Sequence, residues 1–124
     1  MKLNIVHLVG RAGKDPEVRY FESGKMKCTV TLAVRRRKKE DEPDWFDLEF
    51  WDKNAKTAAD HVRKGSLIGV QGVLRFDRWV DSTTGKTRTR PVIRVDRLEL
   101  LGPKRENGQE HDGTFDGEDD SLPY

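Results

Sequence analysis

The chain has 124 residues, 34% of them apolar and 37% charged, and this length supports one small domain with a single core. Its only cysteine, Cys28, excludes an intrachain disulfide and a cluster of thiolate metal ligands. The histidines lack the spacing of a metal site, and the chain has neither the apolar core of a signal peptide nor an apolar run that could cross a membrane. We therefore expect a cytoplasmic protein without a metal or cofactor.

Charge divides the chain into two parts. Residues 1–105 carry all 24 Lys and Arg and 15 of the 22 Asp and Glu, a net charge of +9, whereas residues 106–124 carry seven acids and no basic residue. The basic part favours a polyanionic partner, because Lys and Arg displace the counterions condensed on phosphates. The acidic part contains glycines and no periodic apolar pattern. We therefore predict a domain over residues 1–105 and a disordered tail over residues 106–124.

The first half of the domain is predicted to consist of strands. Apolar residues within 3–9 indicate a first strand, which the segment 10–16, rich in Gly, Asp and Pro, should end. Over residues 26–35 apolar and polar side chains alternate, as in a strand with one buried face. The charged run 36–44 is predicted to be a hairpin loop.

The strand predicted over residues 45–51 has two different faces, because successive side chains point to opposite sides. One face holds Phe46, Leu48 and Phe50, and the other holds Trp45, Asp47, Glu49 and Trp51. The first face suits a core. The two tryptophans are therefore expected on the mixed, solvent-facing side.

Residues 52–64 form the one predicted helix. Its apolar stripe consists of Ala55, Ala58, Ala59 and Val62. Asp52 is expected to be the N-cap, and Gly65 stands where a glycine commonly ends a helix. Because the stripe is mostly alanine, the helix should pack closely, as a plug or connector.

Residues 67–80 are predicted to form a long strand, in which Gly69 and Gly72 permit a bend or bulge. A turn over residues 81–85 and a returning strand over 87–101 follow. Five strands with a helix between the third and fourth is the order of an OB-fold, a small Greek-key barrel that commonly binds single-stranded nucleic acid or oligosaccharide. We therefore predict an all-β, five-stranded OB-fold barrel with one short helix.

Tryptophans and cations alternate on strand faces that do not form the core. Trp45, Trp51 and Trp79 lie on such faces, the last beside Arg78 and on the same side of its strand as Arg75. Bases stack on indole rings while Arg and Lys bind phosphates, and each stacked base contributes about 1–3 kcal/mol. A single tryptophan is more often a core or interface residue. Three of them in such positions favour stacking.

Two charged clusters are open to other interpretations. The basic run 35–39 is either a phosphate-binding hairpin arm or a solvated loop neutralised by the acids at 40–42. Asp47 and Glu49 lack a nearby histidine or third acid and lie among cations, so we do not interpret them as a metal site. Because the sequence offers no nucleophile–base pair and no phosphate-binding glycine loop, no enzymatic activity is predicted.

Five segments, in order, span essentially the whole domain. They are LVGRAGKDPEVRY (8–20), TLAVRR (31–36), DWFDLEFWDKNA (44–55), RKGSLIGVQGVLRFDRW (63–79) and TGKTR (84–88). Together they resemble the bacterial-type single-stranded DNA-binding proteins (SSB family), and the amino-acid sequence of several segments is similar to that of cyanobacterial members. The resemblance implies an OB-fold homotetramer that binds and protects single-stranded DNA in replication, recombination and repair, without enzymatic activity.

The resemblance also implies roles for individual residues. The residues that it implies for base stacking are Trp45, Trp51 and Trp79. The residues that it implies for phosphate contacts are Arg11, Arg35, Lys64, Arg75 and Arg78. We expect two further phosphate contacts from the basic hairpins, at Arg36 and Arg88. The tip of the tail is expected to dock replication, recombination and repair enzymes through Asp119, Asp120, Leu122, Pro123 and Tyr124.

The chain departs from the family pattern in two places. The loop over residues 36–43 lacks an aromatic side chain that members often carry, and the tail ends in Pro123-Tyr124 instead of Pro-Phe, with Ser121 in place of a common third acid. Two alternatives remain open. One is an OB-fold RNA-binding chaperone, because stacking and phosphate contacts serve both polymers. The other is a scaffold subunit whose tryptophans lie at subunit contacts.

Overall fold

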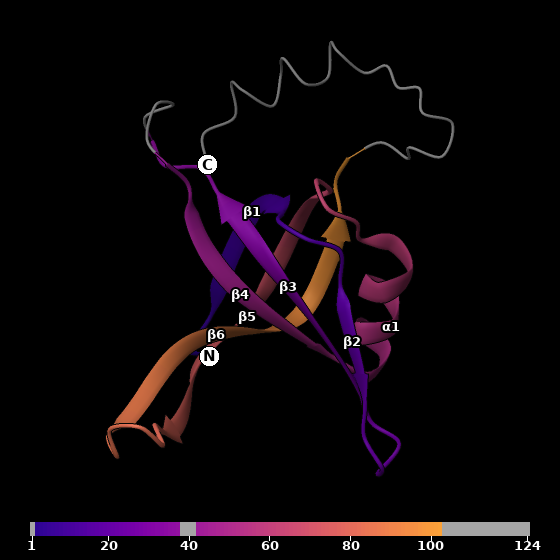
Figure 1. The fold of residues 1–124 in the computed structure, drawn as a ribbon. Coiled ribbons are helices and arrows are strands. Elements are labelled where there is room, and N and C mark those ends of the chain that lie inside the picture. Colours follow the sequence, from indigo (N-terminus) through magenta and orange to yellow (C-terminus); the bar gives the residue numbers. More distant parts are fainter. Residues whose placement is uncertain (1, 38–41, 103–124) are drawn as a thin grey trace.

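The computed structural model of the chain describes residues 2–37 and 42–102 (Figure 1). Its strands are β1 (Val6–Ala12), β2 (Glu17–Tyr20), β3 (Met26–Val34), β4 (Asp44–Trp51), β5 (Leu67–Val80) and β6 (Thr87–Leu100). The helix α1 (Asp52–His61) lies between β4 and β5. The mostly-β architecture with one short helix is therefore confirmed, and the tail predicted over residues 106–124 lies outside the described residues.

The strands form one sheet that closes on itself. Around the sheet they follow the order β1, β5, β6, β4, β3 and β2, and a further pairing between β1 and β3 completes the ring. All neighbours are antiparallel except β4 and β6, which run parallel where Leu48 lies opposite Ile93. β1 pairs with residues 32–33 of β3 and β2 pairs with residues 26–29, so both lie along one edge of β3. The first barrel strand is thus divided between β1 and β2.

The start of the domain differs from the prediction in three respects. β1 begins at Val6, so Leu3 and Ile5, predicted to belong to the first strand, precede it and are exposed. β1 continues to Ala12 instead of ending before Gly10, because Gly10 and Arg11 pair with Ile68 and Leu67 of β5. A side chain at Gly10 would lie 2.2 Å from the carbonyl oxygen of Ala33, so the glycine allows β1 to approach β3. β2 was not predicted at all. Its four residues, Glu-Val-Arg-Tyr, are all exposed, so the segment is short and has no buried apolar face that would mark it as a strand.

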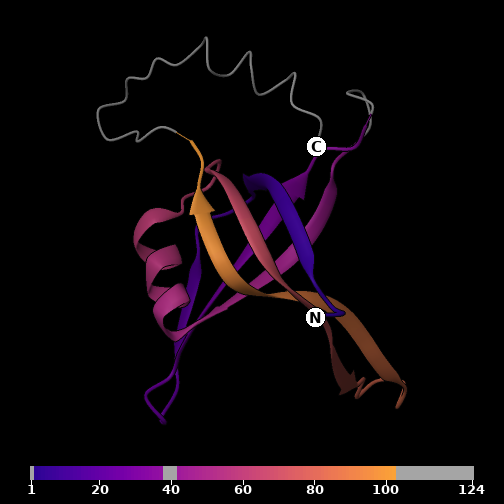
Figure 2. The same ribbon diagram turned by 180° about the vertical axis from the view of Figure 1, so that it is seen from behind.

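The core fills the barrel from the predicted faces of its strands. The largest fully buried apolar side chains are Cys28, Val30 and Leu32 from β3, Leu48 and Phe50 from β4, and Ile68 from β5, with Val62 following α1. Phe46 is partly buried and packs against this core. Helix α1 lies against the barrel beside β2 and β6, with Ala55 and Ala58 completely buried (Figure 2). The alanine stripe thus allows the close packing that the sequence predicted.

Helix α1 begins at Asp52 as predicted, but the predicted N-cap residue and the predicted C-terminal end were wrong. The N-cap position is Trp51, and Asp52 has a left-handed backbone (φ +50°), with its carboxylate accepting a hydrogen bond from the Met26 amide at 3.2 Å. Because β4 runs directly into α1, Asp52 makes the change of direction instead of capping the helix. The helix ends at His61 rather than residue 64, and Gly65 (φ +92°) lies in the turn that follows.

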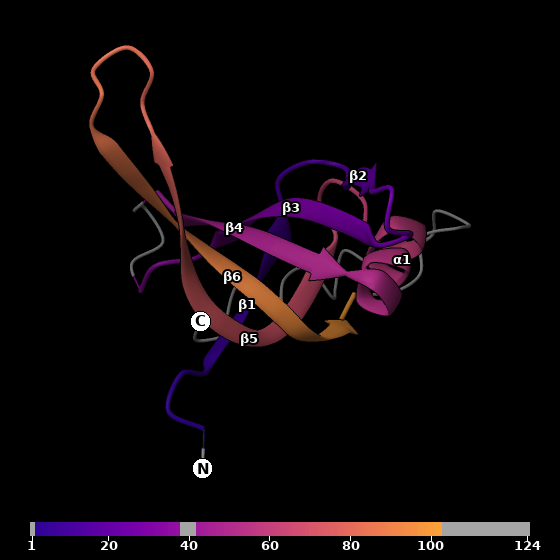
Figure 3. The ribbon, with the colours of Figure 1, turned by 90° about the horizontal axis from the view of Figure 1, so that it is seen from below.

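The β5–β6 hairpin bends across the barrel and then extends away from it as an arm (Figure 3). The pairing register shifts between Gln71 and Gly72, which confirms the predicted bulge. A side chain at Gly72 would lie 2.2 Å from the carbonyl oxygen of Arg94, so only glycine permits this approach. The turn at the end of the arm begins at Asp81, and Gly85 adopts a positive φ of +74° there.

Candidate nucleic-acid interface

One continuous outer surface of the barrel collects the side chains of β3 to β6 that do not enter the core. In β3, Lys27, Thr29, Thr31 and Ala33 lie opposite Trp51, Glu49, Asp47 and Trp45 of β4. Glu49 pairs in turn with Arg94 of β6, and Val92, Arg90 and Arg88 of β6 pair with Arg75, Asp77 and Trp79 of β5. Paired residues project to the same side of a sheet. These residues form what we call the outer face, and all three tryptophans lie on it.

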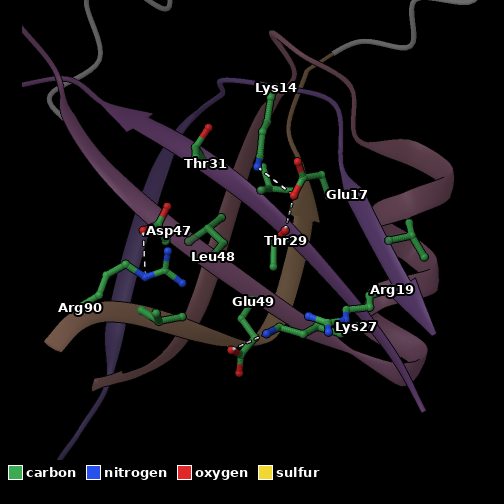
Figure 4. Close-up of a pocket in the computed structure, with 13 residues that line it drawn as sticks. Lys14, Glu17, Arg19, Lys27, Thr29, Thr31, Asp47, Leu48, Glu49 and Arg90 are labelled. Atoms are coloured by element: carbon green, nitrogen blue, oxygen red, sulfur yellow. Dashed lines mark hydrogen bonds and ion pairs between the residues drawn. The ribbon is translucent and has the colours of Figure 1, made fainter. Parts of the chain in front are cut away.

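A groove of about 560 Å³ crosses the outer face toward β2 (Figure 4). Its charged lining comprises Lys14, Glu17, Arg19, Lys27, Asp47, Glu49 and Arg90. Lys14 pairs with Glu17 at 3.4 Å, Arg90 with Asp47 at 3.8 Å, and Lys27 with Glu49 at 3.8 Å. The groove therefore combines cations with acids that partly neutralise them.

Trp45 lies at the start of β4 and is 59% exposed. Its indole ring lies over Gly13, where a β-carbon would come within 2.5 Å of the ring. The absence of a side chain at Gly13 thus makes room for the ring against the segment between β1 and β2. The exposed remainder of Trp45 is available for stacking.

Trp51 is held more firmly than Trp45. Its ring stacks on Phe21 with 5.7 Å between centroids and 27° between planes. Lys27 Nζ and the guanidinium carbon of Arg94 lie 5.7 and 5.8 Å from the indole centroid. The indole nitrogen donates a hydrogen bond to Oε2 of Glu49 at 2.8 Å. Trp51 therefore lies in a fixed position among cations.

Trp79 is 46% exposed on the β5–β6 arm, opposite Arg88 in the pairing register. Arg88 Nε lies 2.9 Å from Oδ2 of Asp81, at the turn of the same arm. Arg75 shares the outer face with Trp79, as the sequence predicted. Arg78, the neighbour of Trp79 in the chain, projects to the opposite side of β5 because side chains alternate.

Glu49 is only 2% exposed, although its strand position is on the outer face. Arg75 covers it, with Nη2 2.6 Å from Oε1 and Nε 3.2 Å from Oε2. Burial by itself raises the pKa of Glu49, but hydrogen bonds from Arg75 and Trp51 and the charges of Arg75 and Lys27 outweigh it, and the pKa lies below its ordinary value. Glu49 is therefore ionised and paired, in place of the solvent-facing acid that the sequence indicated.

The other predicted phosphate contacts lie at the ends of strands. Arg11 Nη1 donates to the carbonyl of Gly65 at 3.1 Å. The exposed Lys64 lies in the same turn. At the other hairpin, Arg35 and Arg36 follow β3, and Arg36 Nε lies 3.0 Å from Oδ1 of Asp44. The five residues predicted for the partner-docking tip, 119–120 and 122–124, lie outside the described residues.

Sequence reasoning assigned no role to several residues of this site, among them Lys27 beside Trp51 and two residues of the β2 segment. Phe21 stacks on Trp51, and the guanidinium of Arg19 lies 5.4 Å from the centroid of the Phe21 ring. Both come from β2 and the turn after it, a segment for which no strand was predicted. An aromatic pair, Tyr20-Phe21, just before a glycine turn was the signal available in the sequence.

Fold and surface together define a class of protein. A small closed β-barrel that presents aromatic rings among Arg and Lys side chains on one face offers partners for unstacked bases and for phosphates. Among residues 2–37 and 42–102, no three His, Cys, Asp or Glu side chains gather as metal ligands would. In the same part of the chain, no helix has the length and apolar character needed to span a bilayer.

Comparison with known proteins gives the family. Residues 3–101 match the model of the single-strand binding protein family. Single-stranded DNA-binding protein 1 of Nostoc sp. is 59% identical over 123 residues, 99% of this chain and 98% of that protein. Single-stranded DNA-binding protein 1 of Synechocystis sp. is 60% identical over 111 residues, 88% and 92% of the two chains. The single-stranded DNA-binding protein of Bacillus cereus is 36% identical over 117 residues, 91% of this chain and 68% of that protein.

The chain belongs to the single-strand binding protein family. The predicted resemblance, including the similarity to cyanobacterial members, is therefore confirmed. The same finding confirms the OB-fold as the identity of the barrel.

Proposed function

We propose that the chain binds single-stranded DNA, without preference for sequence, along the outer face. One observation carries the proposal: Trp45, Trp51 and Trp79 come from two strands and yet share one face of the barrel. Stacking on aromatic rings tolerates any base, because every base has a π-face. The names of the relatives, which are single-stranded DNA-binding proteins, support the same polymer.

The outer face also offers cations for the phosphates. Arg88 lies opposite Trp79 on the arm, while Lys27 and Arg94 lie beside the Trp51 ring. Binding therefore combines stacking with ionic contacts, and the acids of the groove reduce the net charge that phosphates meet. This combination supports a binding protein rather than an enzyme, in keeping with the family.

The further roles follow from the resemblance. We infer that the protein acts in the cytoplasm, near the nucleoid, as a homotetramer in DNA replication, recombination and repair. Asp119, Asp120, Leu122, Pro123 and Tyr124 are the residues proposed to recruit partner enzymes. The support is chemical, since an apolar anchor that follows a run of acids suits a basic pocket with an apolar floor.

Titration of the intrinsic tryptophan fluorescence with oligo(dT) tests the main proposal. Strong, saturable quenching is expected, because stacked bases quench indole emission. Tighter binding of oligo(rU) than of oligo(dT) would favour the RNA chaperone instead. Unchanged fluorescence with both polymers would favour a scaffold whose tryptophans lie at subunit contacts. Sedimentation equilibrium of the free protein tests the tetramer.

A further inference from the structure

A buried acid lies on the face that we propose binds a polyanion. Glu49 is 2% exposed at the middle of β4 and borders the groove of the outer face (Figure 4). A negative charge on a phosphate-binding surface repels the ligand. An acid at this position therefore needs a favourable role that outweighs the repulsion.

The contacts of Glu49 indicate such a role. Its carboxylate accepts hydrogen bonds from Arg75 of β5 at 2.6 and 3.2 Å and from the indole nitrogen of Trp51 at 2.8 Å. Lys27 of β3 lies 3.8 Å away. One carboxylate thus contacts side chains from three strands. Two of these side chains, Trp51 and Arg75, are predicted to contact DNA.

We infer that Glu49 is a positioning residue for single-strand binding, which holds the Trp51 ring and the Arg75 guanidinium in the arrangement that the polymer meets. The inference rests on the proposed function. The indole N–H is directional, and its bond to a buried carboxylate fixes the plane of the ring. The forked contact with Arg75 fixes the guanidinium in the same way. Groups that are ordered before binding lose less conformational freedom when the strand arrives.

A simpler view makes the opposite prediction. If Glu49 served only to neutralise Arg75 in the fold, removal of its charge would release Arg75 and Lys27 to bind phosphates, and affinity would rise. If Glu49 positions Trp51 and Arg75, the same change lowers affinity. The sign of the effect therefore separates the two views.

Glu49→Gln and Asp47→Asn form a matched pair for this test. Each removes one negative charge from the same groove with little change in side-chain volume, and Asp47 has a 41% exposed side chain whose Arg90 contact is a longer 3.8 Å. Glu49→Gln is expected to weaken oligo(dT) binding about tenfold, the loss that accompanies one poorly placed stacked base. Asp47→Asn is expected to tighten binding about twofold, as for loss of an exposed charge.

A second readout reports on the ring itself. In a Trp45→Phe, Trp79→Phe background, fluorescence reports Trp51, and Glu49→Gln should reduce the maximal quenching by saturating oligo(dT). Thermal unfolding establishes that each variant is folded. Should Glu49→Gln not fold, Trp51→Phe serves in its place, because it keeps an aromatic ring while removing the donor to Glu49, together with the second ring of the indole. It should weaken binding about threefold, the effect of losing one hydrogen bond to a buried acceptor.

These experiments distinguish failure of the positioning role from failure of the proposed function. Binding of Glu49→Gln that equals or exceeds that of the wild type, with unchanged Trp51 quenching, overturns the positioning role. If Glu49→Gln does not fold, a wild-type affinity of Trp51→Phe for oligo(dT) overturns the positioning role. Failure of the wild-type protein to bind oligo(dT) would reject the proposed function itself, a result that the unmodified protein gives before any variant is made.

Discussion

The phenyl ring of Phe21 stacks on the indole ring of Trp51, with 5.7 Å between the centroids. Phe21 belongs to the turn after β2, whereas Trp51 ends β4, so the contact joins the β2–β3 hairpin to the end of β4 on the outer face. Trp45 and Trp79, at 59% and 46% exposed, are the more accessible rings. The three predicted stacking residues are therefore not equivalent.

Alanine substitution of the tryptophans should reveal this difference. Trp45→Ala and Trp79→Ala are each expected to weaken oligo(dT) binding by about 1–3 kcal/mol, the worth of one stacked base, with a change in stability within about 0.5 kcal/mol. Trp51→Ala should also lower the unfolding free energy, by about 2–3 kcal/mol, because it removes a ring stack and leaves Glu49 without one donor.

Anisotropy of a labelled oligonucleotide measures the affinity, and urea denaturation measures the stability. Circular dichroism shows whether each variant keeps its strands. If Trp45→Ala or Trp79→Ala unfolded the barrel, those side chains would be core residues and their assignment to the interface would be wrong.

Salt should weaken binding through the ionic contacts alone. The logarithm of affinity is expected to fall linearly with the logarithm of salt concentration, with a slope of about −0.7 for each phosphate contact. Arg88→Ala, which removes a cation opposite Trp79, should make this slope shallower by about 0.7. Lys56→Ala is the control, because Lys56 lies on α1 and pairs with Asp60 at 3.2 Å. An affinity that does not respond to salt would contradict the ionic part of the interface.

The sequence predicted local features well because they depend on neighbours in the chain. Alternation identified the buried faces of β3 and β4, and the alanine repeat identified α1. The burial of Glu49 was not predictable in this way. It depends on Arg75, which lies 26 residues away and reaches Glu49 across β6, the strand between β4 and β5. The same reason applies to Phe21, whose contact with Trp51 requires the pairing of β2 with β3.

Gly72 should be the less replaceable of the two glycines predicted to shape β5. A β-carbon at Gly72 would lie 2.2 Å from the backbone oxygen of Arg94, whereas one at Gly69 would meet the flexible end of Leu101 at 3.3 Å. Gly72→Ala is therefore expected to lower the unfolding free energy by about 3 kcal/mol or more, and Gly69→Ala to change it by less than about 1 kcal/mol. Urea denaturation of both variants measures this difference, and equal stability of the two would show that the bulge does not depend on Gly72.

Acid should destabilise the fold in part through Glu49. Burial raises the pKa of this carboxyl, but its bonds to Arg75 and Trp51 outweigh burial, so folding lowers the pKa. The unfolded chain then takes up a proton at a higher pH than the folded chain does. The stability that Glu49 contributes is complete above its unfolded pKa, about 4.3, and is lost as pH falls through the lower pKa of the folded state.

Thermal unfolding between pH 7 and pH 3 should show this linkage. Glu49→Gln is expected to have a lower melting temperature than the wild type at pH 7, and the gap should narrow below about pH 4.3. Asp77, whose pKa burial raises but Arg75 and Arg90 lower on balance, remains in both proteins. Parallel melting curves over the whole range would mean that Glu49 does not couple folding to proton uptake.

Removal of the last six residues should separate DNA binding from partner recruitment. Residues 119–124 hold two acids and the apolar anchor of Leu122, Pro123 and Tyr124. Their deletion is expected to leave the melting temperature and the assembly state unchanged, because every strand of the barrel lies within residues 6–100 of the described part of the chain. Oligo(dT) binding should stay the same or tighten slightly at low salt, since acids compete with phosphates for the same cations, and the difference should disappear at high salt.

Recruitment should depend on the apolar anchor as well as on charge. Tyr124→Ala keeps every acid of the tail and removes the terminal ring, so it should reduce capture of a replication or repair enzyme in a pull-down while oligo(dT) affinity stays at the wild-type value. The six-residue deletion should abolish capture. Equal recovery of the enzyme by full-length, Tyr124→Ala and truncated proteins would mean that the tip only keeps the protein soluble.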